Sequence, residues 1–120
     1  MVVLNQFMES YNKFNHLKIH TQYSICEGAL KIDELSDFCK KNKIRALGLS
    51  DTSNLCGALE FSENISKVGT QPILGTQINF KYKNEYGLLP LIAKTKKGYS
   101  SMVNLSSKSF LDIDDQETPH

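Results

Sequence analysis

The spacing of hydrophobic residues changes along the chain, and the changes predict where strands and helices lie. Apolar and polar residues alternate from Phe14 to His20, which is typical of a short strand. Over residues 30–42 the apolar spacing becomes helical, with acidic residues early and lysines late, as a helix dipole favours. An apolar run at residues 46–50 predicts a buried parallel strand. Residues 1–13 lack a period, and we predict a flexible lead-in there.

A second helix is predicted after a polar turn. The turn is Asp51–Asn54, which is rich in turn-forming side chains and directly follows the buried strand. The helix then covers about residues 57–67, and its expected inward positions are Leu59, Phe61 and Ile65. We expect Gly69 to end it, because glycine readily adopts the left-handed conformation of a helix C-terminal cap.

The rest of the pattern predicts two strands and a third helix. One strand opens at Pro72 and continues through Tyr82, a hairpin-like turn follows at residues 84–87, and an apolar strand covers residues 88–93. A helix that begins at Lys97 carries three apolar side chains, Met102, Val103 and Leu105. We predict no helix or strand for residues 112–120.

This β-α-β-α-β-β-α order indicates an α/β fold with a parallel or mixed sheet. Right-handed crossovers place the helices outside a barrel or on the faces of an open sheet, and sites in such folds form at the carboxyl ends of strands. The 120 residues suffice for one domain. Since an α/β barrel needs about 200 residues or more, we expect residues 14–111 to form only part of one.

Composition narrows the class of protein. The chain is 40% hydrophobic and 22% charged with a net charge of +1, which excludes a disordered tail and a polybasic nucleic-acid-binding module. No apolar run approaches the ~18 residues of a membrane span, and the start lacks the pattern of a secretory signal. The three cysteines (Cys26, Cys39 and Cys56) form no CxxC pair. A disulfide framework and a zinc knuckle are therefore disfavoured, and a reducing, cytoplasmic setting is expected.

Two groups of residues are candidates for chemistry. His16 and His20 lie on one face of the first predicted strand with Lys18, where two histidines can share a metal ion, although partly buried polar residues at a strand end are the favoured interpretation. Asp51 follows the buried strand, where carboxylates are often catalytic. The spacing favours a helix cap or an Asx turn at Asp51 instead.

Other motifs are weaker. Lys94, Lys96 and Lys97 form a basic cluster that indicates a solvated helix start or, less often, a phosphate contact. The glycines form neither GxGxxG nor a P-loop, and the serines lack a GxSxG setting. Cys39 is most simply a core residue.

Taken together, several segments resemble the PHP (polymerase and histidinol phosphatase) domain that begins the alpha subunit of bacterial DNA polymerase III. The similarity runs from about Phe14 to Phe110, and the motifs keep the order and spacing of that family. The matching segments are residues 16–24, 27–29, 46–54, 55–61 and 71–75.

The resemblance implies a distorted barrel in which intact members hold divalent metals, such as Mn²⁺ or Zn²⁺, that activate water against a phosphoester. Three ligand positions depart from the family pattern. They carry Lys18, Thr52 and Gln77, where the family has histidine, histidine and an acid. The remnant ligand positions are His20, Glu27 and Asp51. Since a protonated lysine cannot ligate a metal, we expect no metal here and a lost phosphoesterase activity.

The resemblance thus implies a catalytically inactive platform that docks the proofreading exonuclease (epsilon) subunit and supports a polymerase core. The parent protein would be a DNA-directed DNA polymerase that uses Mg²⁺, works with other holoenzyme subunits, and contacts DNA through downstream regions. The alternative is a metal-dependent phosphoesterase of histidinol-phosphatase type with unusual ligands. On the first interpretation, residues 112–120 are a cut edge, and the isolated piece is expected to associate through its open strand edge.

Overall fold

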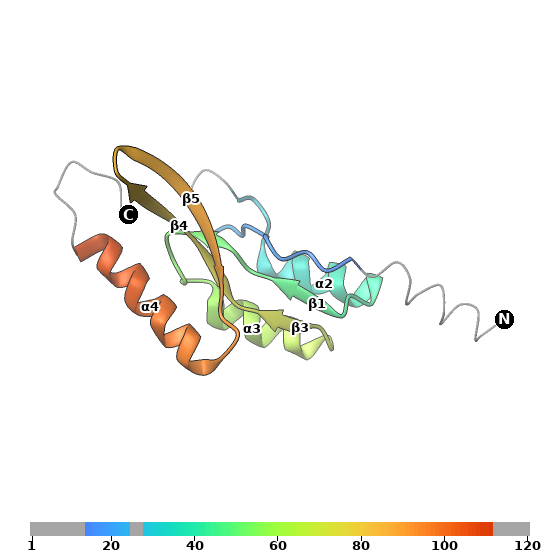
Figure 1. Ribbon diagram of the computed structural model, residues 1–120. Helices are drawn as coiled ribbons and strands as arrows, with labels where there is room; N and C mark the ends of the chain where they lie inside the picture. Colours follow the sequence, from blue (N-terminus) through green and yellow to red (C-terminus); the bar gives the residue numbers. More distant parts are fainter. Residues whose placement is uncertain (1–13, 25–27, 112–120) are drawn as a thin grey trace.

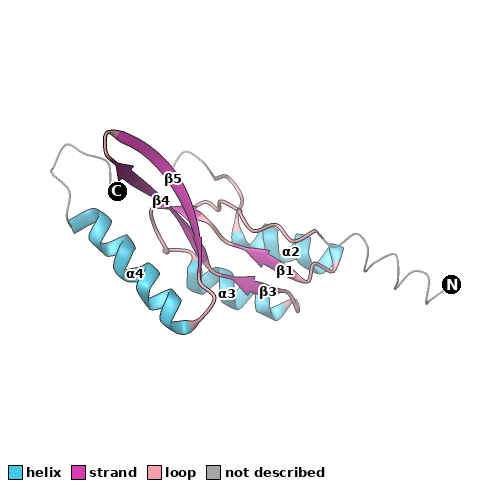
Figure 2. Cartoon of the chain, viewed as in Figure 1, coloured by secondary structure: helices cyan, strands magenta, loops and turns pink. Residues whose placement is uncertain are grey.

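A computed structural model describes residues 14–24 and 28–111 (Figures 1 and 2). The elements are α2 (Ile32–Asn42), β1 (Ala46–Gly48), β2 (Asp51–Thr52), α3 (Ala58–Lys67), β3 (Gln71–Ile73), β4 (Gly75–Tyr82), β5 (Glu85–Ile92) and α4 (Lys96–Leu111). From residue 30 onward this α/β order follows the predicted one, whereas the strand predicted for residues 14–20 is not among the elements. The predicted lead-in, the tail at residues 112–120, Cys26 and Glu27 lie outside the described residues.

The strands form a two-stranded sheet, β1-β3, and a three-stranded mixed sheet, β2-β4-β5, in keeping with the predicted parallel or mixed arrangement. β1 pairs with β3 and β2 pairs with β4, both in parallel, whereas β4 and β5 form an antiparallel hairpin. The register keeps the same offset from Ala46↔Gln71 to Asp51↔Thr76. The strand predicted from Pro72 to Tyr82 is therefore one path through the sheet that is interrupted at Leu74.

The segment predicted as the first strand runs beside β1 but forms only one bridge, Ile19↔Leu49. The Gly48 N–H donates to the His16 carbonyl at 2.7 Å, and the Ser50 N–H donates to the Ile19 carbonyl at 2.8 Å. Glycine is required at position 48, because a Cβ there would lie 2.6 Å from the Leu17 Cα. The prediction of a strand over residues 14–20 was thus wrong, because only Ile19 forms a bridge.

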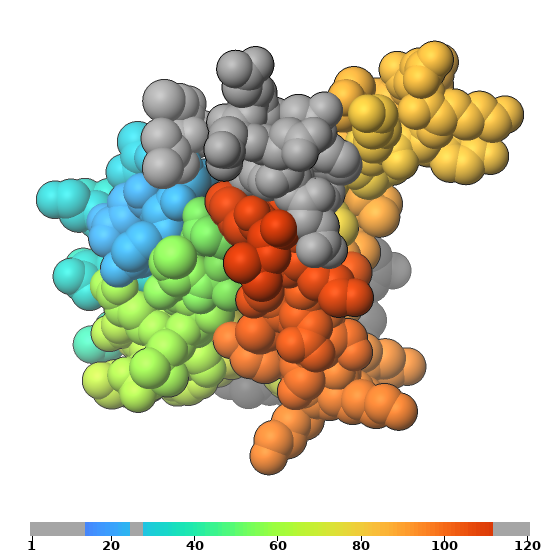
Figure 3. Space-filling model, turned by 90° about the vertical axis from the view of Figure 1, so that its left-hand side faces the viewer, coloured from blue at the N-terminus to red at the C-terminus, as the bar shows by residue number. Residues whose placement is uncertain are grey.

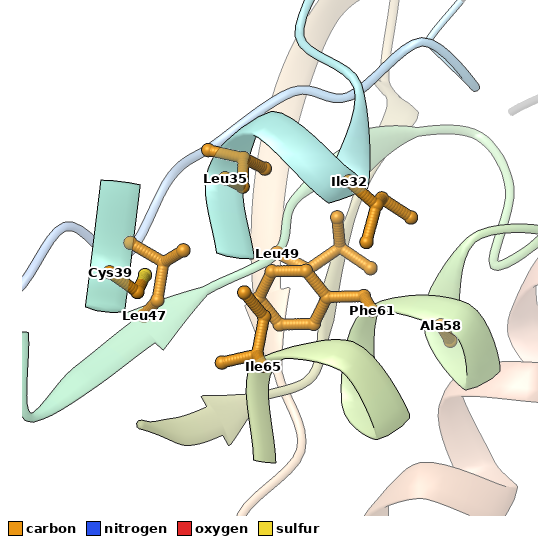
Figure 4. Close-up of a cluster of buried hydrophobic side chains, with 8 residues drawn as sticks. All are labelled: Ile32, Leu35, Cys39, Leu47, Leu49, Ala58, Phe61 and Ile65. Atoms are coloured by element: carbon orange, nitrogen blue, oxygen red, sulfur yellow. The ribbon is translucent and has the colours of Figure 1, made fainter. Parts of the chain in front are cut away.

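The core lies between the strands and two helices that pack side by side, α2 and α3 (Figure 2). It consists of Ile32, Leu35, Cys39, Leu47, Leu49, Ala58, Phe61 and Ile65 (Figure 4). Phe61, Ile65 and Cys39 were predicted as core residues and are buried. Leu59 was predicted to face inward, but 72% of it is exposed, because the buried face of α3 is carried by positions 58, 61 and 65.

Both predicted turns are displaced: the first begins later along the chain than predicted, and the hairpin turn lies earlier. Asp51 and Thr52 belong to β2, and the chain turns at Ser53, whose φ is 59°. The hairpin turn occupies Lys83 and Asn84 instead of residues 84–87. Because the turn has only two residues, Glu85 pairs directly with Tyr82, and β5 begins at Glu85 instead of residue 88. Gly69 has φ +81°, as predicted for the end of α3.

β5 is the edge strand of the described sheet, and it contains a proline. The Ala93 N–H donates to the Leu74 carbonyl at 2.8 Å, so odd-numbered residues of β5 direct their backbone groups toward β4. Pro90 is even-numbered, and its missing N–H therefore falls on the free edge. The hairpin loses no hydrogen bond to this proline.

The hairpin and α4 expose many large apolar side chains. Figure 3 shows the hairpin, in yellow, standing away from the body of the molecule. The exposed residues are Phe80, Tyr82, Tyr86, Leu88, Leu89, Ile92, Val103, Leu105, Phe110 and Leu111. Of the three apolar side chains predicted on this helix, Met102 is buried, whereas Val103 and Leu105 are exposed. No helix in residues 14–24 or 28–111 is both long and apolar enough to cross a membrane.

Candidate functional site

The carboxyl end of β2 lies beside the first residues of β4 and meets the loop that follows Ile19. Thr52 of β2 pairs with Gln77 of β4, and the loop residues Thr21 and Ser24 pack over Asp51. This is the strand edge at which the sequence predicts a site. We call the group Asp51, Thr21, Ser24, Thr52 and Gln77 the strand-end cluster.

Asp51 is the centre of the strand-end cluster and is fully buried. Its Oδ1 accepts hydrogen bonds from the Thr21 N–H at 2.6 Å and from the Ser24 hydroxyl at 2.8 Å. Its Oδ2 accepts one from the Thr21 hydroxyl at 2.7 Å. Buried carboxylates need such donors, and here both oxygens are engaged by the protein itself. The carboxylate therefore ties the loop to the sheet.

The predicted cap at Asp51 is wrong. The N-cap residue of α3 is Gly57, and no side chain hydrogen-bonds the start of that helix. Asn54 makes the Asx-type contact instead, because its Oδ1 accepts a hydrogen bond from the Cys56 N–H at 3.1 Å. The spacing alone did not distinguish these two polar residues of the same turn.

Ser24 links Asp51 to two further groups. Its buried hydroxyl accepts a hydrogen bond from the Thr52 N–H at 3.0 Å while it donates to Asp51. The same oxygen lies 3.4 Å from Nδ1 of His20, which is half-buried. His20 therefore touches the strand-end cluster through Ser24.

Gln77 is buried in the position where the resemblance expects an acid. Its Nε2 lies 3.4 Å from the Thr52 Oγ1, and its Oε1 has no hydrogen-bond partner. The Ser50 hydroxyl is a second buried polar atom without a partner. A neutral amide at position 77 brings no negative charge to this edge.

The remaining predicted site residues are not part of the strand-end cluster. His16 and Lys18 are exposed, and the His16 ring meets the Phe14 ring edge-on at 4.8 Å. Within residues 14–24 and 28–111, no three His, Cys, Asp or Glu side chains gather so as to hold a metal ion. The side chains described here do not fit a multi-metal centre, and Glu27 lies outside the described range.

A second anchoring pair beside the cluster escaped the sequence reasoning. The Tyr23 hydroxyl donates to the Glu60 carboxylate at 2.6 Å, and this hydrogen bond raises the pKa of Tyr23 above its usual value of 10.0. The Asn54 amide donates to the Tyr23 carbonyl at 2.8 Å. Tyr23 and Glu60 lie 37 positions apart, so no short sequence motif contains both residues and the pair could not be recognised from the sequence.

Comparison with known proteins identifies the fold around this strand edge. Residues 16–120 match the PHP domain. The chain belongs to the PHP domain family. The match includes the whole described sheet, both core helices and α4.

The PHP domain of this chain is similar to DNA polymerase III alpha subunits from several bacteria. The identity is 38% with the protein from Rickettsia felis over 90% of the chain, 34% with that from Haemophilus influenzae over 86%, and 35% with that from Thermus aquaticus over 88%. The chain spans about a tenth of the length of these curated relatives, since it covers 9%, 9% and 10% of them.

Solved structures confirm the fold. A proposed metal-dependent phosphoesterase from Bifidobacterium adolescentis superimposes with a TM-score of 0.58 at 17% identity, over 81% of this chain and 34% of that one. An amidohydrolase from Chromobacterium violaceum, solved with sulfate and no metal, gives 0.59 at 15% identity, over 78% of this chain and 34% of that one. The described part is therefore a partial fold of this type.

Proposed function

We propose that this chain is part of a DNA polymerase III alpha subunit, where its PHP portion is a catalytically silent platform. The observation that carries this proposal is the 34–38% identity with alpha subunits over most of the chain, combined with Lys18, Thr52 and Gln77 at the expected ligand positions. The parent protein would carry out template-directed nucleotidyl transfer in the cytoplasm, with Mg²⁺, other holoenzyme subunits and DNA bound by other regions.

The strand-end cluster supports the silent state. A carboxylate that ligates a metal must direct lone pairs toward the ion, whereas the Asp51 oxygens are occupied by three donors from Thr21 and Ser24. Lys18 stands where the family has a histidine ligand, and a protonated lysine cannot ligate a metal. The cluster thus works as an internal brace that holds the loop at the strand ends.

As a platform, the domain would dock the proofreading exonuclease (epsilon) subunit. Copurification of the full alpha subunit, or of its complete PHP domain, with the purified exonuclease tests this role. We expect a stable complex on gel filtration. Separate elution of the two proteins at micromolar concentration would overturn the docking role without affecting the family membership.

The second candidate function is a phosphoesterase that uses unusual ligands. It is favoured by one observation: His20 lies beside Ser24 and Asp51 at the strand edge. Elemental analysis of the purified protein, followed by hydrolysis of p-nitrophenyl phosphate with added Mn²⁺ or Zn²⁺, separates the two functions. The platform predicts no stoichiometric metal and no turnover. Turnover that disappears in His20→Ala would establish the enzyme instead.

A further inference from the structure

A hollow forms where β5 leaves the sheet. After Ala93 donates to the Leu74 carbonyl, the chain turns into α4, while the strand path of β3 continues beyond the end of the hairpin (Figure 1). The space between the β3 edge and the first turn of α4 measures about 380 Å³. Its lining residues, which define the lysine-rimmed hollow, are Gln71, Pro72, Leu74, Ala93, Lys94, Thr95, Lys96 and Tyr99.

The floor of the lysine-rimmed hollow suits an apolar side chain and a peptide backbone. Pro72, Leu74 and Tyr99 are half-buried there. The Gln71 N–H donates to Arg45 and the Ile73 carbonyl accepts from Leu49, so both residues face β1. In a parallel pair the intervening Pro72 directs its carbonyl the other way, on the side of the hollow. That carbonyl offers an acceptor to the N–H of an extended peptide.

The rim carries positive charge that the described residues do not neutralise. Lys94 and Lys96 are exposed, and neither forms an ion pair within residues 14–24 and 28–111. The first turn of α4 contains no acidic residue, whereas that of α2 contains Asp33 and Glu34. Lysines at the positive end of a helix dipole repel it, so a negative partner would relieve a real electrostatic conflict.

We propose that the lysine-rimmed hollow docks an acidic peptide segment of a partner protein. One apolar side chain of the segment packs on Pro72, Leu74 and Tyr99, and flanking carboxylates pair with Lys94 and Lys96. A nucleic acid fits less well, because the chain as a whole has a net charge of only +1 and the floor is apolar. The inference does not rest on the proposed function, and the hollow is separate from the strand-end cluster.

Selection from a phage-displayed library of random peptides against the 120-residue chain tests this proposal. We expect enrichment of peptides in which acidic residues flank a large apolar residue. Their dissociation constants, measured by fluorescence anisotropy, should rise about tenfold or more in the double variant Lys94→Glu and Lys96→Glu. Tyr99→Ser should weaken binding with less dependence on salt, because it removes an apolar contact.

The matched control is Lys40→Glu with Lys41→Glu, which makes the same charge change at exposed positions in the last turn of α2. It should leave peptide binding unchanged, and circular dichroism should show that all variants remain folded. Enrichment of peptides without acids, equal loss in both double variants, or no enrichment would overturn the proposal. Tighter binding of an oligothymidylate than of any selected peptide would also overturn it and assign the lysines to nucleic acid.

Discussion

Asp51 accepts three hydrogen bonds from a loop about 30 positions earlier in the chain, so its main consequence is for stability. We predict that Asp51→Ala lowers the free energy of unfolding by about 3 kcal/mol or more, because buried donors at Thr21 and Ser24 lose their acceptor. Thr21→Val removes a single hydroxyl donor and should cost about 1–3 kcal/mol. Urea denaturation measures both free energies of unfolding.

The control is Ser66→Ala, at an exposed position on α3, which should change the free energy of unfolding by about 0.5 kcal/mol or less. Equal stability of Asp51→Ala and Ser66→Ala would contradict the bracing role.

Tyr23 and Glu60 provide a test that depends on pH. The neutral phenol donates to the carboxylate, so the folded-state pKa of Tyr23 lies above the unfolded value of 10.0. The contribution of this pair is therefore fully present below pH 10 and is lost as the pH rises through the raised pKa. We predict that Glu60→Gln shifts the Tyr23 titration, followed by ultraviolet absorbance with Tyr23→Phe as the blank, toward lower pH. An unchanged titration would show that the hydrogen bond does not set this pKa.

The same residues show what sequence alone can and cannot predict. The apolar run before Asp51 predicted a turn at this residue, whereas in the structure the chain turns at Ser53 and Asp51 is the first residue of β2. Its partners Thr21 and Ser24 lie in a segment without any period, where no local pattern indicates which side chain points inward. The prediction for Leu59 is wrong for the opposite reason: the residue is apolar and lies on a helix, but it occupies the exposed face of α3. Local pattern therefore predicts elements better than it predicts the contacts between them.

At the scale of elements, Pro90 makes a sharp prediction about the hairpin. Its missing N–H lies on the free edge of β5, so Pro90→Val should leave the bonds to β4 intact and expose a new donor on that edge. Leu89→Pro moves the same defect by one position and removes a bond to β4. We expect Pro90→Val to aggregate faster while it melts at a similar temperature. Leu89→Pro should lower the melting temperature, and reversed results would refute the assigned register.

α4 illustrates a conflict between stability and the proposed docking. Lys96 and Lys97 lie in its first turn without an acidic residue, against the helix dipole. We predict that Lys97→Glu, which does not line the lysine-rimmed hollow, raises the free energy of unfolding by about 0.3–1 kcal/mol at low salt. Urea denaturation at two salt concentrations measures the gain, which should shrink as salt increases. A loss of stability at low salt would show that the lysine makes a favourable contact instead.

At the scale of the whole molecule, the hairpin exposes several large apolar side chains, and clustered exposed apolar side chains favour association. The chain covers 34% of each of the two solved chains that share its fold. We predict concentration-dependent association of the 120-residue chain in sedimentation velocity. Leu88→Glu with Ile92→Glu, at two exposed positions on the same face of β5, should shift it toward a monomer. Leu59→Glu places one negative charge at an exposed leucine on α3, away from the hairpin, and should leave the association unchanged. Because Pro90 blunts backbone pairing along the free edge of β5, association should depend on side-chain burial and weaken on cooling, as hydrophobic contacts do. A monodisperse monomer at every concentration, in the wild type as well as in the variants, would show that the apolar face does not drive association.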